Sequence, residues 1–186
     1  MKRAETGQTR SPARRAAELG LWMALAIVIS TLEEFLPTIP VPGAKPGLSN
    51  IVTMLVLSVD GLPAAMLVTG GKAVFALFRG GTAFVLSLAG GVCSTLLMVL
   101  CRRLFGRYVS YVGIGVAGAV AHNLAQWGVA MLMMSSSLLY YAPWLLLTAT
   151  VAGTVTGLVL NIAMPALERL PVWGRAGIHR KAGYEP

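Results

Sequence analysis

Residues 108–167 read YVSYVGIGVAGAVAHNLAQWGVAMLMMSSSLLYYAPWLLLTATVAGTVTGLVLNIAMPAL, a stretch of sequence without any Asp, Glu, Lys or Arg. Over the whole chain of 186 residues, charged residues make up 12% and hydrophobic residues 56%. Average soluble domains carry about 25% charged residues. The composition therefore excludes an ordinary cytosolic enzyme and predicts an all-α integral membrane protein, whose length suits one compact bundle.

Six apolar stretches are long enough, or nearly long enough, to be membrane helices. Because a bilayer core of about 30 Å needs about 20 apolar residues, the sequence predicts helices at 19–36, 47–59, 62–78, 82–101, 112–134 and 138–164. The second stretch would reach only about 18 Å as a helix. It is therefore either a tilted partial span or a re-entrant element that protein shields from lipid. The predicted fold is a six-helix bundle with a short second helix.

The basic residues indicate which side of the membrane each end faces. The net charge is +8, and most Lys and Arg side chains occur near the N-terminus, in a loop that begins with Arg102, or near the C-terminus. With six crossings these three places share one side, and the loops of the other side hold Lys45 and Arg79. By the positive-inside rule both termini are cytoplasmic, and the charge reflects topology rather than nucleic-acid binding. The predicted organisation is a basic cytoplasmic tail at 1–17, a transmembrane domain at 18–167 and a basic cytoplasmic tail at 168–186.

Small residues recur at every fourth position in the last three predicted helices, a pattern that lets helix backbones approach closely in lipid. The stripes are Ala83, Ser87, Gly91 and Thr95; Gly113, Ala117, Ala121 and Ala125; and Ala149, Gly153 and Gly157. We expect these three helices to pack against one another. The first helix carries two shorter pairs, Gly20 with Ala24 and Ala26 with Ser30, which serve either packing within the bundle or docking to a partner membrane protein.

Two cationic side chains lie in the third predicted helix. Lys72 and Arg79 are seven positions apart, which places them on one helix face, about 10 Å apart along the axis. Ionisable groups at membrane depth are unfavourable unless they face protein or water. The two residues therefore form either a cationic wall for a substrate or structural contacts. In the structural alternative, Arg79 extends to the membrane interface and Lys72 pairs with Glu33 or Glu34.

The fifth predicted helix contains the polar run AHNLAQW at residues 121–127. His122, Asn123 and Gln126 lie within about one turn of each other. Three hydrogen-bonding side chains so close together are not expected to face lipid. We expect them to point into the bundle, where they either bridge helices or line a ligand cavity.

The segment between the first two predicted helices is stiff. Residues 37–47 read PTIPVPGAKPG, and proline fixes φ while glycine permits tight turns. This loop, with Pro42, Gly43, Lys45 and Gly47, serves either as a connector or as a cap over a site that opens outward. It leads to Asn50, where we expect the short helix to begin with free backbone N–H groups suited to an anion.

Motifs for catalysis and metal binding are absent from the sequence. Cys93 and Cys101 lie eight positions apart in one helix, which is too far for a disulfide. The sequence contains no CxxC or Cys/His metal spacing, no Walker A motif, no acidic pair for a Mg²⁺-diphosphate and no G-x-S-x-G motif. We therefore predict no enzymatic activity, no metal and no cofactor.

Two segments resemble a family of small bacterial membrane proteins. Residues 42–53, PGAKPGLSNIVT, resemble P-G-x-K-x-G-L-A-N-I-V-T, and residues 118–126, GAVAHNLAQ, resemble G-A-x-x-H-N-x-x-Q. Both segments are typical of proteins catalogued as Gx transporters or as heptaprenyl diphosphate synthase component I. The resemblance runs from about residue 17 to residue 165, and the chain departs from it at Pro46 and Ser49.

This family in turn resembles the substrate-binding S components of energy-coupling factor transporters. The resemblance implies six helices, a ligand pocket towards the outer face of the bacterial cell membrane, and a first helix that docks a membrane coupling subunit with cytosolic ATPases. The implied docking residues are Gly20, Ala24, Ala26 and Ser30. The residues implied to bind an anionic or polar metabolite are Asn50, Lys72, Arg79, His122, Asn123 and Gln126.

The catalogue name implies a second possibility. In that alternative the chain is a membrane accessory subunit of heptaprenyl diphosphate synthase, which makes the side chain of menaquinone. A third possibility, a secondary carrier that acts alone, is disfavoured because the six predicted spans contain no repeated half.

Overall fold

The structure is a computed structural model and describes residues 11–35, 47–133, 140 and 142–169. Within these residues it contains six α-helices and no strand, which confirms the predicted all-α fold. The helices are α1 (Pro12–Leu32), α2 (Asn50–Val59), α3 (Leu62–Ala76), α4 (Gly81–Phe105), α5 (Tyr111–Met133) and α6 (Ala142–Glu168). Short 3-10 turns at Glu33–Phe35, Leu77–Arg79 and Gly106–Tyr108 follow α1, α3 and α4.

Three helices extend beyond their predicted limits, and one of them is α6, which continues to Glu168. α1 begins at Pro12 rather than at residue 19, because Ser11 caps it by accepting a hydrogen bond from the backbone N–H of Arg14 at 3.3 Å. Proline is also favourable in the first turn of a helix. α4 continues to Phe105. Arg102 therefore lies inside the helix, whereas it was predicted to lie in a loop. Arginine is a good helix former, and the helix ends only where Gly106 takes a positive φ of 48°.

Four helical segments are long and apolar enough to cross a membrane: Pro12–Phe35, Leu62–Arg79, Gly81–Phe105 and Ala142–Glu168. α5 is also long, with 23 residues, but His122, Asn123 and Gln126 make it less apolar. α2 has only ten residues and therefore reaches about 15 Å, half of a bilayer core. The chain is thus a membrane protein by its helices, while the side that each terminus faces stays a prediction.

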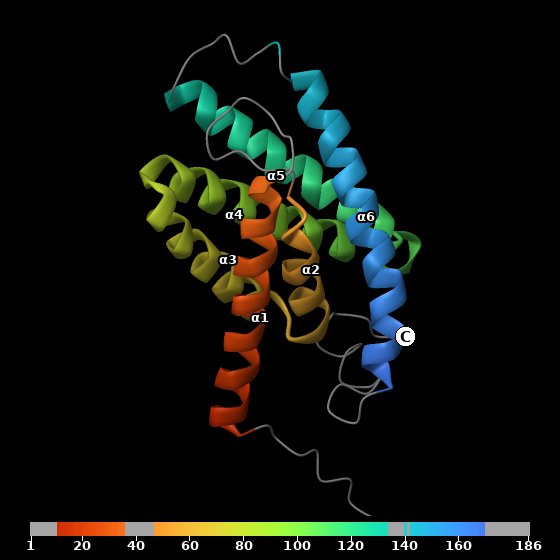
Figure 1. The fold of residues 1–186 in the computed structure, drawn as a ribbon. Coiled ribbons are helices and arrows are strands. Elements are labelled where there is room, and N and C mark those ends of the chain that lie inside the picture. The colour runs from red at the N-terminus through yellow and green to blue at the C-terminus, as the bar shows by residue number, and fades with distance from the viewer. Residues whose placement is uncertain (1–10, 36–46, 134–139, 141, 170–186) are drawn as a thin grey trace, which may run out of the picture.

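α2 occupies the middle of the bundle and contacts each of the other five helices. Figure 1 shows it between α1 and α6, with α4 and α5 passing across the molecule. Nine of its ten residues are buried. Its apolar side chains share one buried cluster with Val68 of α3, Met98 of α4, Ile114 of α5 and Leu160 of α6. α2 therefore corresponds to the second of the two predicted forms, an element that protein shields from lipid.

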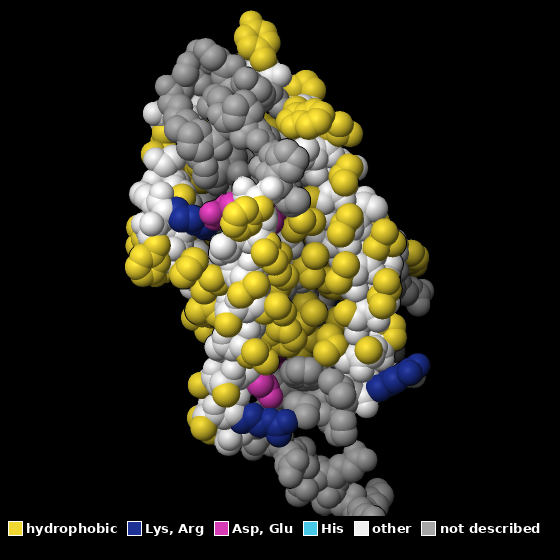
Figure 2. Space-filling view, in the orientation of Figure 1, with side chains coloured by type: hydrophobic (Ala, Val, Ile, Leu, Met, Phe, Trp, Pro, Cys, Tyr) yellow, Lys and Arg dark blue, Asp and Glu magenta, His cyan; other side chains and the backbone are white. Residues whose placement is uncertain are grey.

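The outer surface is divided into levels of different polarity. On the face shown in Figure 2, charged side chains gather at two levels, and the band between them is uncharged and largely hydrophobic. Large apolar side chains such as Leu21, Val28, Val151 and Ile162 are exposed on this protein. A contiguous apolar surface of this kind is expected where helices contact lipid tails.

Glycines set the close contact between α5 and α6. A Cβ added at Gly115 would overlap the backbone of Gly153, and one at Gly157 would overlap the backbone of Val112. The predicted stripes on α4 and α6 are buried, but on α5 the buried face is offset from the predicted one. Gly113, Ala117, Ala121 and Ala125 are only partly buried. The reason is that His122, Asn123 and Gln126 must face the interior, which orients α5 with Gly115 towards α6.

We predict opposite effects for two glycine substitutions on α5. Gly115→Ala should destabilise the protein by about 1–3 kcal/mol, because a methyl group cannot fit against the α6 backbone. This corresponds to a fall of roughly 2–12 °C in the midpoint of thermal unfolding in detergent. Gly128→Ala is the matched control, since a Cβ there meets nothing within 4 Å. It should leave stability unchanged or raise it by about 0.5–1 kcal/mol. Equal midpoints for the two variants would contradict the close packing of α5 on α6.

Candidate functional site

A tight turn places the start of α2 against α5. Gly47 has a φ of +90°, a conformation that favours glycine, and its carbonyl accepts a hydrogen bond from the N–H of Asn50 at 3.0 Å. A Cβ at Gly47 would lie 3.1 Å from Asn50 Nδ2 and 3.4 Å from His122 Cδ2. The turn thus brings Asn50 and His122, which are far apart in the sequence, to one place inside the bundle.

Lys72 lies beside the same end of α2. It is only 2% exposed, and its ammonium donates a hydrogen bond to Ser49 Oγ at 3.0 Å. Ser49 directly precedes α2, so the ammonium lies at the positive end of the helix dipole. Two sources of positive potential therefore meet in a buried region.

The backbone at this end of α2 differs from the prediction of free N–H groups. The N–H groups of Asn50, Ile51 and Val52 donate to the carbonyls of Gly47, Leu48 and Ser49 at 3.0, 2.9 and 3.3 Å. Such tight i to i+3 bonds are common at helix ends, because they satisfy groups that lack an intrahelical partner. Side chains, rather than these N–H groups, are therefore the groups available to a ligand.

His122 and Gln126 complete the cluster from α5. A Cβ at Gly90 of α4 would lie 2.9 Å from His122 Nδ1 and from Gln126 Cγ. The imidazole is thus held between Gly47, in the turn before α2, and Gly90 on α4. The sequence analysis did not single out Gly90. The available signal was its position immediately before Gly91 in a stripe of small residues.

Asn50 has unused hydrogen-bonding capacity on both of its polar side-chain atoms. It is 1% exposed, and neither its amide nitrogen nor its amide oxygen has a hydrogen-bond partner in the described part of the chain. Buried polar atoms nearly always have a partner, because an unpaired one costs about 1–3 kcal/mol. We call Ser49, Asn50, Lys72, His122 and Gln126 the central cluster.

Two predicted site residues have other partners. Asn123 donates from Nδ2 to the carbonyl of Leu145 at 3.2 Å, so it bridges α5 and α6. Arg79 forms an ion pair with Glu34, at the far end of α3. The proposed cationic wall is therefore divided, since Lys72 reaches Ser49 and Arg79 reaches Glu34.

The predicted loop residues and the predicted docking residues also lie in different places in the structure. Pro42, Gly43 and Lys45 lie outside the described residues, whereas Gly47 belongs to the turn above the central cluster. Gly20 and Ala24 are exposed on the outer face of α1. The other α1 pair, Ala26 and Ser30, is buried inside the bundle.

Arg102 corrects a prediction at the other end of α2. It was predicted to be a topology marker in a loop, but it is only 7% exposed. Its Nη2 donates to Ser58 Oγ at 2.7 Å, and its Cζ lies 5.8 Å from the ring centroid of Tyr111. A cation at the C-terminal end of a helix is favourable. Arg102 thus joins α4 to the end of α2.

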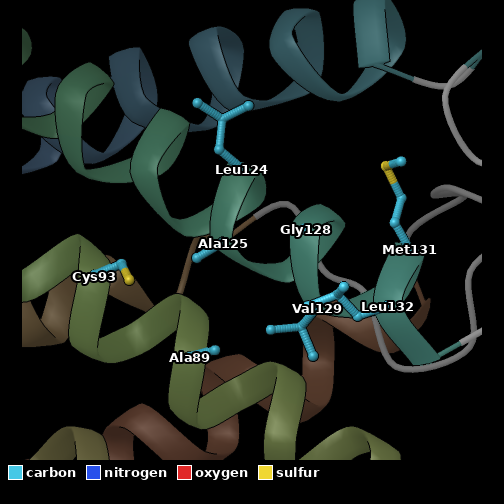
Figure 3. Close-up of a pocket in the computed structure, with 8 residues that line it drawn as sticks. All are labelled: Ala89, Cys93, Leu124, Ala125, Gly128, Val129, Met131 and Leu132. Carbon is cyan, nitrogen blue, oxygen red and sulfur yellow. The ribbon is translucent and has the colours of Figure 1, made fainter.

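A groove on the surface of α4 and α5 is lined by apolar side chains and one cysteine. Its volume is about 570 Å³, and Figure 3 shows it between the two helices. It is lined by Ala89, Cys93, Leu124, Ala125, Gly128, Val129, Met131 and Leu132. Within the described residues, no cluster of three or more His, Cys, Asp or Glu side chains is arranged to hold a metal ion. The central cluster is therefore the candidate site.

Comparison with known proteins gives one match. A protein family described as heptaprenyl diphosphate synthase component I matches residues 22–163, which include the whole central cluster. No curated protein and no solved structure matches the chain.

We predict that Asn123 contributes to the stability of the bundle through its bond to α6. Asn123→Ala removes the hydrogen bond to Leu145 and should cost about 1 kcal/mol, or about 2–4 °C in the unfolding midpoint. Leu124→Ala is the control, because Leu124 is the next residue and faces outward. It should lower the midpoint by less than Asn123→Ala does. A midpoint that is unchanged by Asn123→Ala would show that this bridge does not stabilise the bundle.

Proposed function

We propose that this chain, which belongs to the heptaprenyl diphosphate synthase component I family, is the substrate-binding subunit of a small-molecule uptake transporter. It lies in the cytoplasmic membrane and captures an anionic or polar metabolite from the outer face. The observation that supports this proposal most strongly is the buried Lys72 ammonium at the start of α2, next to an Asn50 side chain with both polar atoms unpaired within the described chain.

The electrostatics at this place favour an anion. The start of a helix carries about half a positive unit charge, and an ammonium carries a full one. At about 4 Å and an effective dielectric constant of about 20, these two charges repel by about 2 kcal/mol. A bound carboxylate or phosphate would reverse the sign, because it attracts both. Asn50, His122 and Gln126 would then hydrogen-bond the same ligand, and Arg79 and Asn123 would have structural roles.

Transport would require a partner that supplies energy. We propose that a membrane coupling subunit, which recruits cytosolic ATPases, docks on the outer face of α1 at Gly20 and Ala24. Both residues are exposed, and a Cβ at Gly20 meets nothing within 4 Å, so a partner helix could approach this face closely. Ala26 and Ser30 are excluded from this proposal because they pack inside the bundle.

A second candidate function rests on the family's description. In this alternative the chain is an accessory subunit that holds a heptaprenyl diphosphate synthase at the membrane. Its role would be positioning rather than catalysis, since prenyl transfer by the usual route needs clustered carboxylates that bind magnesium. Among the described residues only one carboxylate, that of Glu33, is buried, whereas Glu34 is exposed and pairs with Arg79.

The first prediction of the proposed function concerns Lys72. Native mass spectrometry of gently purified protein should detect a co-purified small acid on the wild type. Lys72→Met should reduce its retention about 10-fold to 100-fold, as expected when a buried charged hydrogen bond worth about 1.5–3 kcal/mol is lost. Val74→Met is the control, because Val74 is 57% exposed on the same helix. Equal retention by the two variants, or no acid on the wild type, would contradict the proposal.

The second prediction concerns the partner. A tagged chain purified from its native membranes should bring down a membrane coupling subunit together with its ATPases. Gly20→Leu and Ala24→Leu should abolish this recovery without lowering the unfolding midpoint, because both positions are exposed. Recovery of a prenyl diphosphate synthase instead, with chain elongation that depends on this protein, would favour the accessory-subunit function. A complex that survives both substitutions would remove the docking face from the proposal.

A further inference from the structure

Two more buried hydroxyl groups lie about one helical turn from Asn50 and from Gly90, and were not among the predicted site residues. Thr53 of α2 is 1% exposed and Ser94 of α4 is fully buried. Like the amide of Asn50, neither Thr53 Oγ1 nor Ser94 Oγ has a hydrogen-bond partner in the part of the chain that the structure describes. Asn50 and Thr53 of α2 and Ser94 of α4 thus carry buried polar atoms that have no hydrogen-bond partner within the described residues.

The two hydroxyls belong to helices, α2 and α4, that are in contact with each other. At one end, the His122 ring lies near Gly90 of α4 and near Gly47, in the turn that precedes α2. At the other end, Arg102 of α4 donates to Ser58 of α2. These links relate the start of α2 to Gly90 and the end of α2 to Arg102. Between these links, Thr53 lies one turn beyond Asn50 and Ser94 lies one turn beyond Gly90.

Beyond Thr53 and Ser94, buried methionine side chains lie along α2 and α4. Met98 lies one turn beyond Ser94, is fully buried, and its side chain fills the space against Gly118 of α5. Met54 of α2, the residue after Thr53, is also fully buried. The unsatisfied atoms thus form a short polar region with Lys72 at one end and methionine side chains at the other.

This arrangement specifies the chemistry of the ligand. Leaving buried hydroxyl groups unpaired is unfavourable, and the usual remedy is a hydrogen-bond partner. We propose that the ligand is an acid whose anionic group binds at Lys72, and which carries a neutral hydrogen-bonding group about 6 Å away, one helical turn along α2. Thr53 and Ser94 bind that neutral group and determine specificity. This inference rests on the proposed function and adds the class of substrate to it.

The same region disfavours two other ligand classes. A purely hydrocarbon tail, such as that of a prenyl diphosphate, would leave Thr53, Ser94 and the Asn50 amide unpaired. A cation would be repelled by Lys72 and by the start of α2. The central cluster and the hydroxyl pair together therefore select for an acid with a polar body.

Matched pairs of acids test this inference on the full chain in detergent. The pairs are butyrate with 4-hydroxybutyrate, benzoate with 4-hydroxybenzoate, and propylphosphonate with 3-hydroxypropylphosphonate. In at least one pair, the hydroxylated acid should raise the unfolding midpoint more and bind about fivefold tighter, the value of one net hydrogen bond. Thr53→Val or Ser94→Ala should remove that difference, and Thr53→Ser should keep it.

The unliganded variants test the alternative that the hydroxyls only stabilise the fold. Because these hydroxyls are unsatisfied, Thr53→Val and Ser94→Ala should leave the unfolding midpoint unchanged or raise it. A fall in the midpoint of either variant would overturn the inference. So would the absence of any preference for a hydroxylated acid, or a preference that persists in the double variant. Lys72→Met separates acid binding at Lys72 from the roles of Thr53 and Ser94. If Lys72→Met loses all acid binding while the Thr53 and Ser94 variants bind both acids of each pair like the wild type, the proposed function is retained and only the roles of Thr53 and Ser94 are rejected.

Discussion

The organisation of this protein follows from the burial of one short helix. α2 is too short to cross a bilayer, so the other five helices must enclose it and its two ends must be satisfied inside protein. At its C-terminal end, Arg102 binds Ser58 and lies where the helix dipole attracts a cation. At its N-terminal end, Lys72 lies where the dipole repels a cation. The two ends of α2 thus differ, because the helix dipole favours the cation at one end and disfavours it at the other.

The surrounding helices adapt to this central element. His122 and Gln126 lower the hydropathy of α5, and they face the start of α2. This orientation decides which of the small residues of α5 meet α6. Gly115 then faces Gly153 and Gly157, which lets two backbones pack without side chains between them. The polar interior and the close glycine packing are thus two results of one rotation of α5.

The sequence predicted the six helices and most of the central cluster, because hydropathy and polar residues at membrane depth are local signals. It did not predict the offset face of α5, since spacing tells which residues share a face but not which face is buried. Arg102 was misplaced because a charge near a predicted helix end resembles a topology marker. Thr53 and Ser94 could not be found, because a single hydroxyl in an apolar helix carries no signal until its neighbours in space are known.

The burial of α2 also has a consequence for the order of assembly during biosynthesis. α2 emerges from the ribosome before α3 to α6, so of its five neighbours only α1 has been made by then. The residues that meet at Gly47 lie far apart in the chain, and the contact with His122 forms only after α5 has been inserted. The central cluster is therefore among the last parts of the protein to form. A chain interrupted before α5 would leave the start of α2 without its cover.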